Sequence, residues 1–178
     1  MMASMIVIRY RTIKGGTPAE ILTEVNGLIC RSSKSKMFVT VWMGILDLTD
    51  GRLVCTNAGH EYPFIRSAGG VFRVLRDKHG LVLGGLESTV YQDYELKLEP
   101  GDAVFTYTDG VPEANNSAAE LYGLDRLEQV LNRDPGSGPR EILERVRADV
   151  DRFAEGTKQF DDLTMLCIEY KGSGGSKL

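Results

Sequence analysis

Cysteine is scarce in this sequence, and no long uncharged apolar run is present. The three cysteines, Cys30, Cys55 and Cys167, lie far apart and have no CxxC spacing. This pattern argues against a disulfide framework and fits reduced thiols in a cytoplasmic protein. No apolar run approaches the roughly 18 residues that a membrane span needs, and arginines directly follow the short apolar stretch in MMASMIVIRYR. We therefore expect a cytoplasmic protein without a membrane span.

Basic residues are also fewer than acidic ones. The chain has 21 Lys and Arg against 25 Asp and Glu, a net charge of -4 and a pI of about 5.3. Such a balance excludes a broad electrostatic surface for nucleic acid or anionic lipid, so proteins or small molecules are the expected partners. The sequence contains no GxSxG, P-loop, HExxH or GxGxxG motif, which excludes the usual serine-hydrolase, nucleotide and zinc-peptidase signatures.

The sequence does contain clear helix signals. Hydrophobic periodicity and turn residues predict helices over residues 1–11, 17–30, 124–132 and 139–155. The second begins with Thr17-Pro18-Ala19-Glu20, which has the pattern of a capping box, and Gly15-Gly16 separates it from the first. The fourth carries an apolar stripe made of Ile142, Leu143, Val146, Val150 and Phe153.

Strand signals fill the middle of the chain. A β-hairpin is predicted over 37–48 and 53–59, with Thr49-Asp50-Gly51-Arg52 as its turn. Further strands are predicted over 63–66, 71–75, 89–98, 103–108 and 163–170. In 89–98 the alternation places Val90, Gln92, Tyr94, Leu96 and Leu98 on one face, so that side should meet a core. The glycine- and serine-rich residues 172–178 are expected to form a flexible tail. Strand runs without βαβ alternation predict an α+β domain with antiparallel sheets.

Two acidic clusters follow or precede predicted strands. Asp109 and Gly110 end the segment VFTYTDG, and Asp161 and Asp162 stand immediately before the closing strand. Taken alone, the first cluster is more often a turn and the second a solvated strand entrance than a metal site. Together they offer carboxylates from two strand ends, which is what a hard ion such as Mg²⁺ or Mn²⁺ requires.

A third cluster is Asn57-Ala58-Gly59-His60. His60 could act as an acid–base group or a ligand, but a histidine at a strand end is more often a hydrogen-bonded structural residue. His79, between Lys78 and Gly80, is expected to be an exposed loop residue. The cysteines are expected to be small core residues.

Taken together along the chain, these clusters resemble one family. The strings MFVTVWMGILDLTDGRLVCTNAGHEYPFI, LEPGDAVFTYTDGVPEANN, LYG and FDDLTMLCIEY resemble the SpoIIE-type serine/threonine phosphatases of the metal-dependent, protein phosphatase 2C-like superfamily. The resemblance covers residues 18–170, and we expect a domain over 1–171. It implies an α-β-β-α sandwich of two antiparallel sheets flanked by helices. It also implies a site for two Mn²⁺ or Mg²⁺ ions, with metal-activated water rather than a side chain as nucleophile. Asp109 and Asp161 match the family's metal ligands, and Gly110, Asp162, Asn57 and His60 are candidates for the edge of the site.

One family element is absent. The family has a Gly-Asp-x-x-Gly segment whose aspartate bridges both metals, and nothing like it occurs in these 178 residues. We therefore expect an N-terminally incomplete or degenerate copy with little activity alone. The resemblance implies hydrolysis of a phosphoprotein of the anti-sigma-factor-antagonist type, under an upstream sensor or receiver domain, with a homodimer left open. The alternatives are a pseudophosphatase that binds a partner without hydrolysis and an unrelated α+β binding domain.

Overall fold

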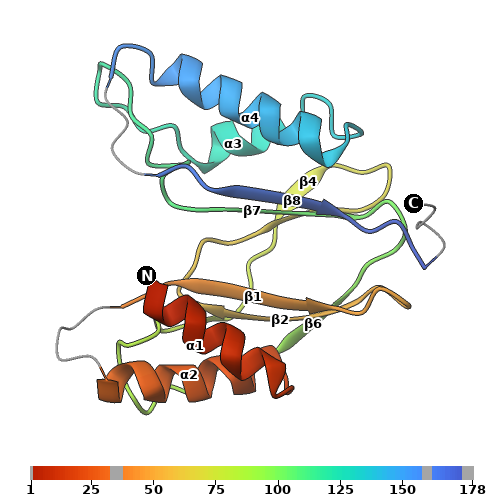
Figure 1. The fold of residues 1–178 in the computed structure, drawn as a ribbon. Coiled ribbons are helices and arrows are strands. Elements are labelled where there is room, and N and C mark those ends of the chain that lie inside the picture. The colour runs from red at the N-terminus through yellow and green to blue at the C-terminus, as the bar shows by residue number, and fades with distance from the viewer. Residues whose placement is uncertain (1, 33–37, 158–161, 174–178) are drawn as a thin grey trace. The chain divides into compact units, whose positions relative to one another are not determined.

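The protein is described by a computed structural model that covers residues 2–32, 38–157 and 162–173. The chain divides into two compact units, each made of two stretches of sequence. Unit 1 comprises residues 1–60 and 77–97, and unit 2 comprises 61–76 and 98–178. In each unit helices cover one face of a sheet (Figure 1).

Unit 1 is built around a central strand. Its elements are α1 (Met2–Ile13), α2 (Pro18–Ser32), β1 (Val41–Leu46), β2 (Arg52–Ala58), β5 (His79–Gly80) and β6 (Tyr94–Lys97). Strand β2 pairs antiparallel with β1 and β6, and parallel with β5. Helix α2 packs on β1 and β2 and buries Ile21, Leu22 and Val25 completely. The apolar stripe of α2 thus supplies the core of this unit.

The start of α2 confirms the predicted capping box. The Glu20 amide donates to Thr17 Oγ1 (3.3 Å), and the Thr17 amide donates to Glu20 Oε2 (2.9 Å). Both bonds satisfy amides that a helix N-terminus leaves without intrahelical partners. Gly15 and Gly16 have φ of 79° and 112°, so the chain turns there in a conformation that glycine tolerates.

The prediction for residues 89–98 is wrong over its first half. Strand β6 begins only at Tyr94, Val90 is 74% exposed, and Tyr91 is buried instead. The backbone of this stretch is engaged elsewhere, because the Tyr91 amide donates to Thr23 Oγ1 (3.2 Å) and the Gln92 carbonyl accepts from Thr56 Oγ1 (2.9 Å). These contacts with α2 and β2 override the local alternation.

His79 also departs from prediction. Its backbone belongs to β5 and pairs with Asn57 of β2 rather than lying in a loop. This short ladder is parallel, so the sheet of unit 1 is not purely antiparallel. The predicted hairpin is confirmed as β1 and β2, with Gly51 (φ 77°) in the turn; its first predicted residue, 37, lies outside the described residues.

Unit 2 contains the second sheet. Its elements are β3 (Phe64–Arg66), β4 (Phe72–Val74), β7 (Ala103–Tyr107), α3 (Leu124–Leu131), α4 (Pro139–Phe153) and β8 (Met165–Glu169). The strands run in the order β4-β3-β7-β8, and every neighbouring pair is antiparallel. The predicted stripe of α4 is confirmed, since Ile142, Val146 and Val150 are buried and Leu143 and Phe153 pack against the same core.

The α+β class is confirmed, with two sheets and flanking helices over the described ranges. Cys55 and Cys167 are buried and Cys30 is half-buried, as expected of core thiols. Within the described part of the chain, no helix is long and apolar enough for a membrane span. Most of the predicted tail, residues 174–178, lies outside the described residues, and the boundary at 171 stays a prediction.

Candidate metal centre

The Thr-Asp-Gly segment forms a tight turn directly after β7. Strand β7 ends at Tyr107, and the amide of Val111 donates to the carbonyl of Thr108 (3.0 Å). The amide of Glu113 donates to the carbonyl of Asp109 (2.9 Å). The Gly110 amide donates to Asp109 Oδ1 (3.0 Å), and Asp109 is exposed whereas Gly110 is buried. The turn therefore fixes the backbone and presents the Asp109 carboxylate to solvent.

Thr108 joins this turn to the segment that precedes β8. Its amide donates to the Thr164 carbonyl (3.0 Å), and its hydroxyl donates to the Asp162 carbonyl (3.0 Å). The Thr164 amide donates back to the Thr108 hydroxyl (3.1 Å). Asp162 is exposed beside the turn. The two acidic motifs, more than fifty residues apart in sequence, are thus hydrogen-bonded neighbours in unit 2.

The register of β7 and β8 dictates this juxtaposition. The two strands pair antiparallel with Tyr107 opposite Met165 and Phe105 opposite Cys167. Continuing the same register by one pair places Thr108 opposite Thr164. Phe105 and Cys167 are buried, and burial raises the pKa of the Cys167 thiol to about 11. The apolar part of the ladder fixes the register of the two strands. This register alone brings Thr108 and Thr164 together, and no separate attraction between them is required.

Asp161 lies outside the described residues, so the approach of its carboxylate to that of Asp109 stays a prediction. Its neighbour Asp162 is placed by the Thr108 hydroxyl. The backbone that leads into β8 therefore contacts the Thr-Asp-Gly turn at Asp162, the residue that follows Asp161.

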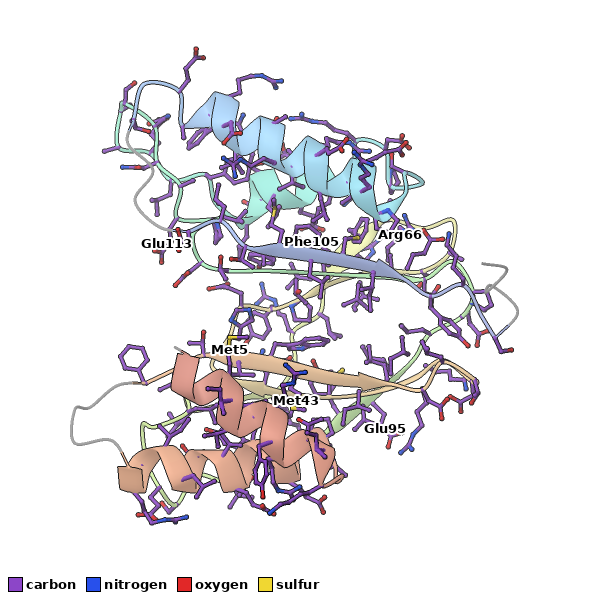
Figure 2. The ribbon with its side chains drawn as sticks, viewed as in Figure 1. Met5, Met43, Arg66, Glu95, Phe105 and Glu113 are labelled. Atoms are coloured by element: carbon purple, nitrogen blue, oxygen red, sulfur yellow. The ribbon has the colours of Figure 1, made fainter. Side chains whose placement is uncertain are left out.

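A cavity of about 270 Å³ borders the turn. It lies between Gly110, Leu163 and the end of α4, with Val150 and Ala154 as apolar lining. Glu113 also lines it and projects from the loop that leaves β7, as Figure 2 shows. The cavity therefore has both apolar and acidic walls and reaches the Thr-Asp-Gly turn at Gly110.

Asn57 and His60 lie in unit 1, where both are hydrogen-bonded, and their place at the edge of a metal site stays a prediction. Asn57 is 1% exposed, its Oδ1 accepts from the His60 amide (2.8 Å) and its Nδ2 donates to the His60 carbonyl (3.1 Å). The His60 ring contacts the hydroxyl of Thr40 through Nδ1 (3.2 Å). The Asn57 side chain holds the backbone at the end of β2, and the His60 ring is hydrogen-bonded to Thr40, which favours the structural interpretation of His60.

Asp77 extends this structural network. It accepts from Asn57 Nδ2 (3.2 Å to each oxygen) and from the Tyr94 hydroxyl (2.7 Å), and the Tyr94 oxygen in turn accepts from Trp42 Nε1 (2.8 Å). Burial, and then the hydrogen bond to Asp77, raise the pKa of Tyr94 above its ordinary value. The Asn57 motif is thus part of a polar network in the unit 1 sheet.

The described residues fit a divalent ion in chemistry but supply few ligands. Asp109 offers a solvent-facing carboxylate, and the Asp162 segment offers oxygen donors beside it, the type of ligand that Mg²⁺ and Mn²⁺ prefer. Over the described ranges, no group of three or more His, Cys, Asp or Glu side chains is arranged to hold a metal. These residues alone would therefore supply only part of a metal site.

Sequence reasoning missed two residues that organise these regions. Thr108 stood inside the recognised motif, and its position opposite Thr164 could have been found by extending the strand register. Asp77 carried no local signal, because its partners Asn57 and Tyr94 lie about twenty residues away on either side.

Comparison with known proteins places the chain in a class of phosphatase folds. The SiaA-PP2C domain of Pseudomonas aeruginosa superposes with a TM-score of 0.79 over 95% of this chain and 68% of that one, at 21% identity. This likeness shows the fold. The family model described as Stage II sporulation protein E (SpoIIE) matches residues 1–171. The chain therefore belongs to the SpoIIE family.

Two curated relatives are longer proteins. Protein IcfG of Synechocystis is 33% identical over 132 residues, which span 74% of this chain and 20% of IcfG. Phosphoserine phosphatase RsbU of Bacillus subtilis is 24% identical over 155 residues, which span 86% of this chain and 45% of RsbU. The chain thus matches less than half the length of either relative.

Proposed function

We propose that this chain is a metal-dependent protein serine/threonine phosphatase domain that removes phosphate from a phosphoprotein. The observation that carries the proposal is the hydrogen bonding of Thr108 to Asp162 and Thr164, which sets the two acidic motifs side by side. Membership of the SpoIIE family supports the same reaction class. The similarity to RsbU, which is named a phosphoserine phosphatase, supports phosphoserine as the substrate group.

Asp109 and Asp161 would hold Mn²⁺ or Mg²⁺, with Gly110 and Asp162 at the edge of the site. Bound divalent ions supply charge neutralisation of phosphoryl oxygens and activation of water. The protein's own contribution is positioning. The amides of Gly110 and Glu113 fix the Asp109 turn, and the Thr108 hydroxyl fixes the backbone at Asp162. Because the backbone at Asp109 and Asp162 is already held, little of it has to be ordered when an ion binds.

The substrate we propose is a protein of the anti-sigma-factor-antagonist type, controlled by an upstream sensor or receiver domain in a cytoplasmic signalling circuit. The support for this substrate and this circuit comes only from membership of the SpoIIE family and similarity to RsbU. An exposed site on a turn, rather than at the bottom of a deep cavity, suits a phosphorylated residue presented on a protein surface.

A titration with Mn²⁺, followed by the electron paramagnetic resonance of the free ion, tests the site assignment. We expect Asp109→Asn and Asp161→Asn each to weaken Mn²⁺ binding by about tenfold or more, because a carboxylate charge at ligand distance is worth over ~1.4 kcal/mol. Asp125→Asn is the matched control, since it removes one exposed acid from α3 of the same unit. Equal loss of binding in all three variants would show that Mn²⁺ responds to net charge and not to this site.

A second candidate function is a pseudophosphatase that binds a phosphoprotein without hydrolysing it. The observation that favours it is the lack of a Gly-Asp-x-x-Gly segment in the 178 residues. Capture of a phosphoprotein by this chain with no release of phosphate in the presence of Mn²⁺ would support it over the phosphatase.

A further inference from the structure

Unit 2 contains a cluster of arginines that the proposed chemistry does not use. Asp149 of α4 is 2% exposed, and its Oδ1 accepts from Arg126 Nε (2.9 Å) and from the Tyr122 hydroxyl (3.1 Å). Its Oδ2 lies 2.7 Å from Arg133 Nη1 and 3.6 Å from Arg152 Nη1. One buried carboxylate therefore gathers three guanidinium groups, and we name Arg126, Arg133 and Arg152 the arginine cluster.

The arginine cluster carries more positive charge and more donors than Asp149 can satisfy. Each guanidinium has five N–H donors, whereas one carboxylate has about four acceptor sites. The side chains of Arg126, Arg133 and Arg152 are 38%, 51% and 68% exposed. Donors that Asp149 does not engage therefore face solvent, where they can reach an anion.

Other arginines of α4 contrast with this arrangement. Arg140 pairs with Glu144 (2.9 Å) and Arg147 pairs with Asp151 (2.8 Å), each with one acid on the next turn of the helix. Those pairs are electrically neutral. The surplus of positive charge therefore arises around Asp149, where Arg126 of α3 and Arg133, just after α3, join Arg152 of α4 at one acid.

A shallow hollow of about 860 Å³ opens beside the arginine cluster. Residues 121–126, Gln129 and Arg133 line it. Arg126 is held rigidly there, because its guanidinium stacks over the rings of Tyr122 (5.2 Å) and Phe153 (4.7 Å). Leu121, 63% exposed, adds an apolar contact at the same place. Asp125 also lines the hollow and opposes one of the positive charges.

We infer that this hollow is a docking site for an acidic segment of a protein partner, with Arg126 and Arg133, which line it, binding carboxylates of the segment and Arg152 adding positive charge from beside Asp149. Charge complementarity favours an anionic occupant, and the preordered guanidinium of Arg126 suits the planar geometry of a carboxylate. The exposed Leu121 favours a polypeptide over a small inorganic ion. A segment of a few acidic residues matches the small number of surplus charges.

Fluorescence anisotropy with a short labelled peptide of alternating glutamate and serine tests the inference. EDTA is present throughout, so that metal ions play no part. We expect Arg133→Gln to weaken binding by roughly two- to fivefold, the worth of an exposed ion pair. Arg152→Gln should weaken binding by less, because Arg152 contacts Asp149 without lining the hollow. Asp125→Asn should strengthen binding by a similar factor, because it removes the opposing charge. Arg140→Gln, which makes the same charge change on α4 away from the hollow, should bind as the unaltered protein does.

Three outcomes would overturn the inference. If Arg140→Gln weakens peptide binding as much as Arg133→Gln does, the effect reflects net charge and not the hollow. Binding that is unchanged in both Arg133→Gln and Arg152→Gln would exclude the cluster; Arg152 is 68% exposed, so its variant tests this even where Arg133→Gln lowers stability. Tighter binding of a single-stranded oligonucleotide of equal charge, with the same arginine dependence, would assign the hollow to nucleic acid. Asp109→Asn should leave peptide binding intact, so this test stands apart from that of the phosphatase site.

Discussion

Replacing Thr108 with valine removes the hydroxyl that connects the two acidic motifs while preserving the shape of the side chain. The hydroxyl donates to the Asp162 carbonyl at 3.0 Å and accepts from the Thr164 amide at 3.1 Å. A neutral hydrogen bond contributes about 0.5–1.5 kcal/mol net, and water can replace part of a bond in an exposed segment. We therefore expect Thr108→Val to lower the free energy of unfolding by about 1 kcal/mol, which is a fall in Tm of about 2–4 °C for a chain of this size.

The more specific effect of Thr108→Val should be on metal binding. Without the hydroxyl, the backbone at Asp162 loses its attachment to the Asp109 turn, so binding an ion must order that segment at a cost in entropy of about 1–2 kcal/mol per residue fixed. We expect Mn²⁺ affinity to fall by about five- to thirtyfold, measured by the same titration as for the aspartate variants.

Matched variants separate this effect from a general loss of stability. Thr106 lies two residues earlier in β7 and has no side-chain hydrogen bond among the described residues, so Thr106→Val is the control. Thr108→Ser keeps the hydroxyl and should restore Mn²⁺ affinity. If Thr108→Val binds Mn²⁺ as well as Thr106→Val does, the hydroxyl does not organise a metal site and the assignment of the two motifs to one centre loses its structural basis.

Three further predictions concern other parts of the molecule. Burial acts to raise the pKa of Asp149, but the guanidinium groups of Arg126 and Arg133 and the Tyr122 hydroxyl outweigh it and lower the pKa below the ordinary value. The stabilisation of the fold by ionised Asp149 is thus present above about pH 4 and is lost as the pH falls through the lowered pKa. On acidification, the urea midpoint of Asp149→Asn should therefore decline less than that of the unaltered protein. Burial raises the pKa of Cys55 to about 12 and that of Cys167 to about 11, so iodoacetamide at pH 8 should label half-buried Cys30 first; faster labelling of Cys55 in the folded protein would contradict this. With no Gly-Asp-x-x-Gly segment, the 178 residues should hydrolyse p-nitrophenyl phosphate near the background of free Mn²⁺, and a longer chain that supplies the segment should turn over faster. Robust turnover that survives Asp109→Asn and Asp161→Asn would place the catalytic site elsewhere.

The elements that the sequence predicted well are those whose signals are local. The capping box at Thr17, the turn at Gly51 and the stripe of α4 each depend on residues within a few positions of one another. The polar motif at Asp109 was predictable for the same reason, since an apolar strand followed by Asp-Gly fixes where the strand ends.

The predictions that failed are those in which distant segments decide the conformation. Residues 89–93 alternate as a strand should, yet Thr23 and Thr56 bind their backbone groups and Tyr91 turns into the core. The ladder between His79 and Asn57 has only two residue pairs, which is too short to leave a pattern in the sequence. Propensity is a weak guide in both places, because the competing hydrogen bonds come from residues far away in the chain.

Net charge shows the same distinction between average and local properties. A value of -4 excludes a broad basic face, and a long nucleic acid needs many phosphate contacts to bind well at physiological salt. It does not exclude a few guanidinium groups gathered by one buried carboxylate, because burying Asp149 without partners would be costly and its arginines repay that cost. The arginines are then available at the surface for a second anion. A short acidic segment requires no more than this, which is why an acidic chain can still present a docking site for an acidic partner.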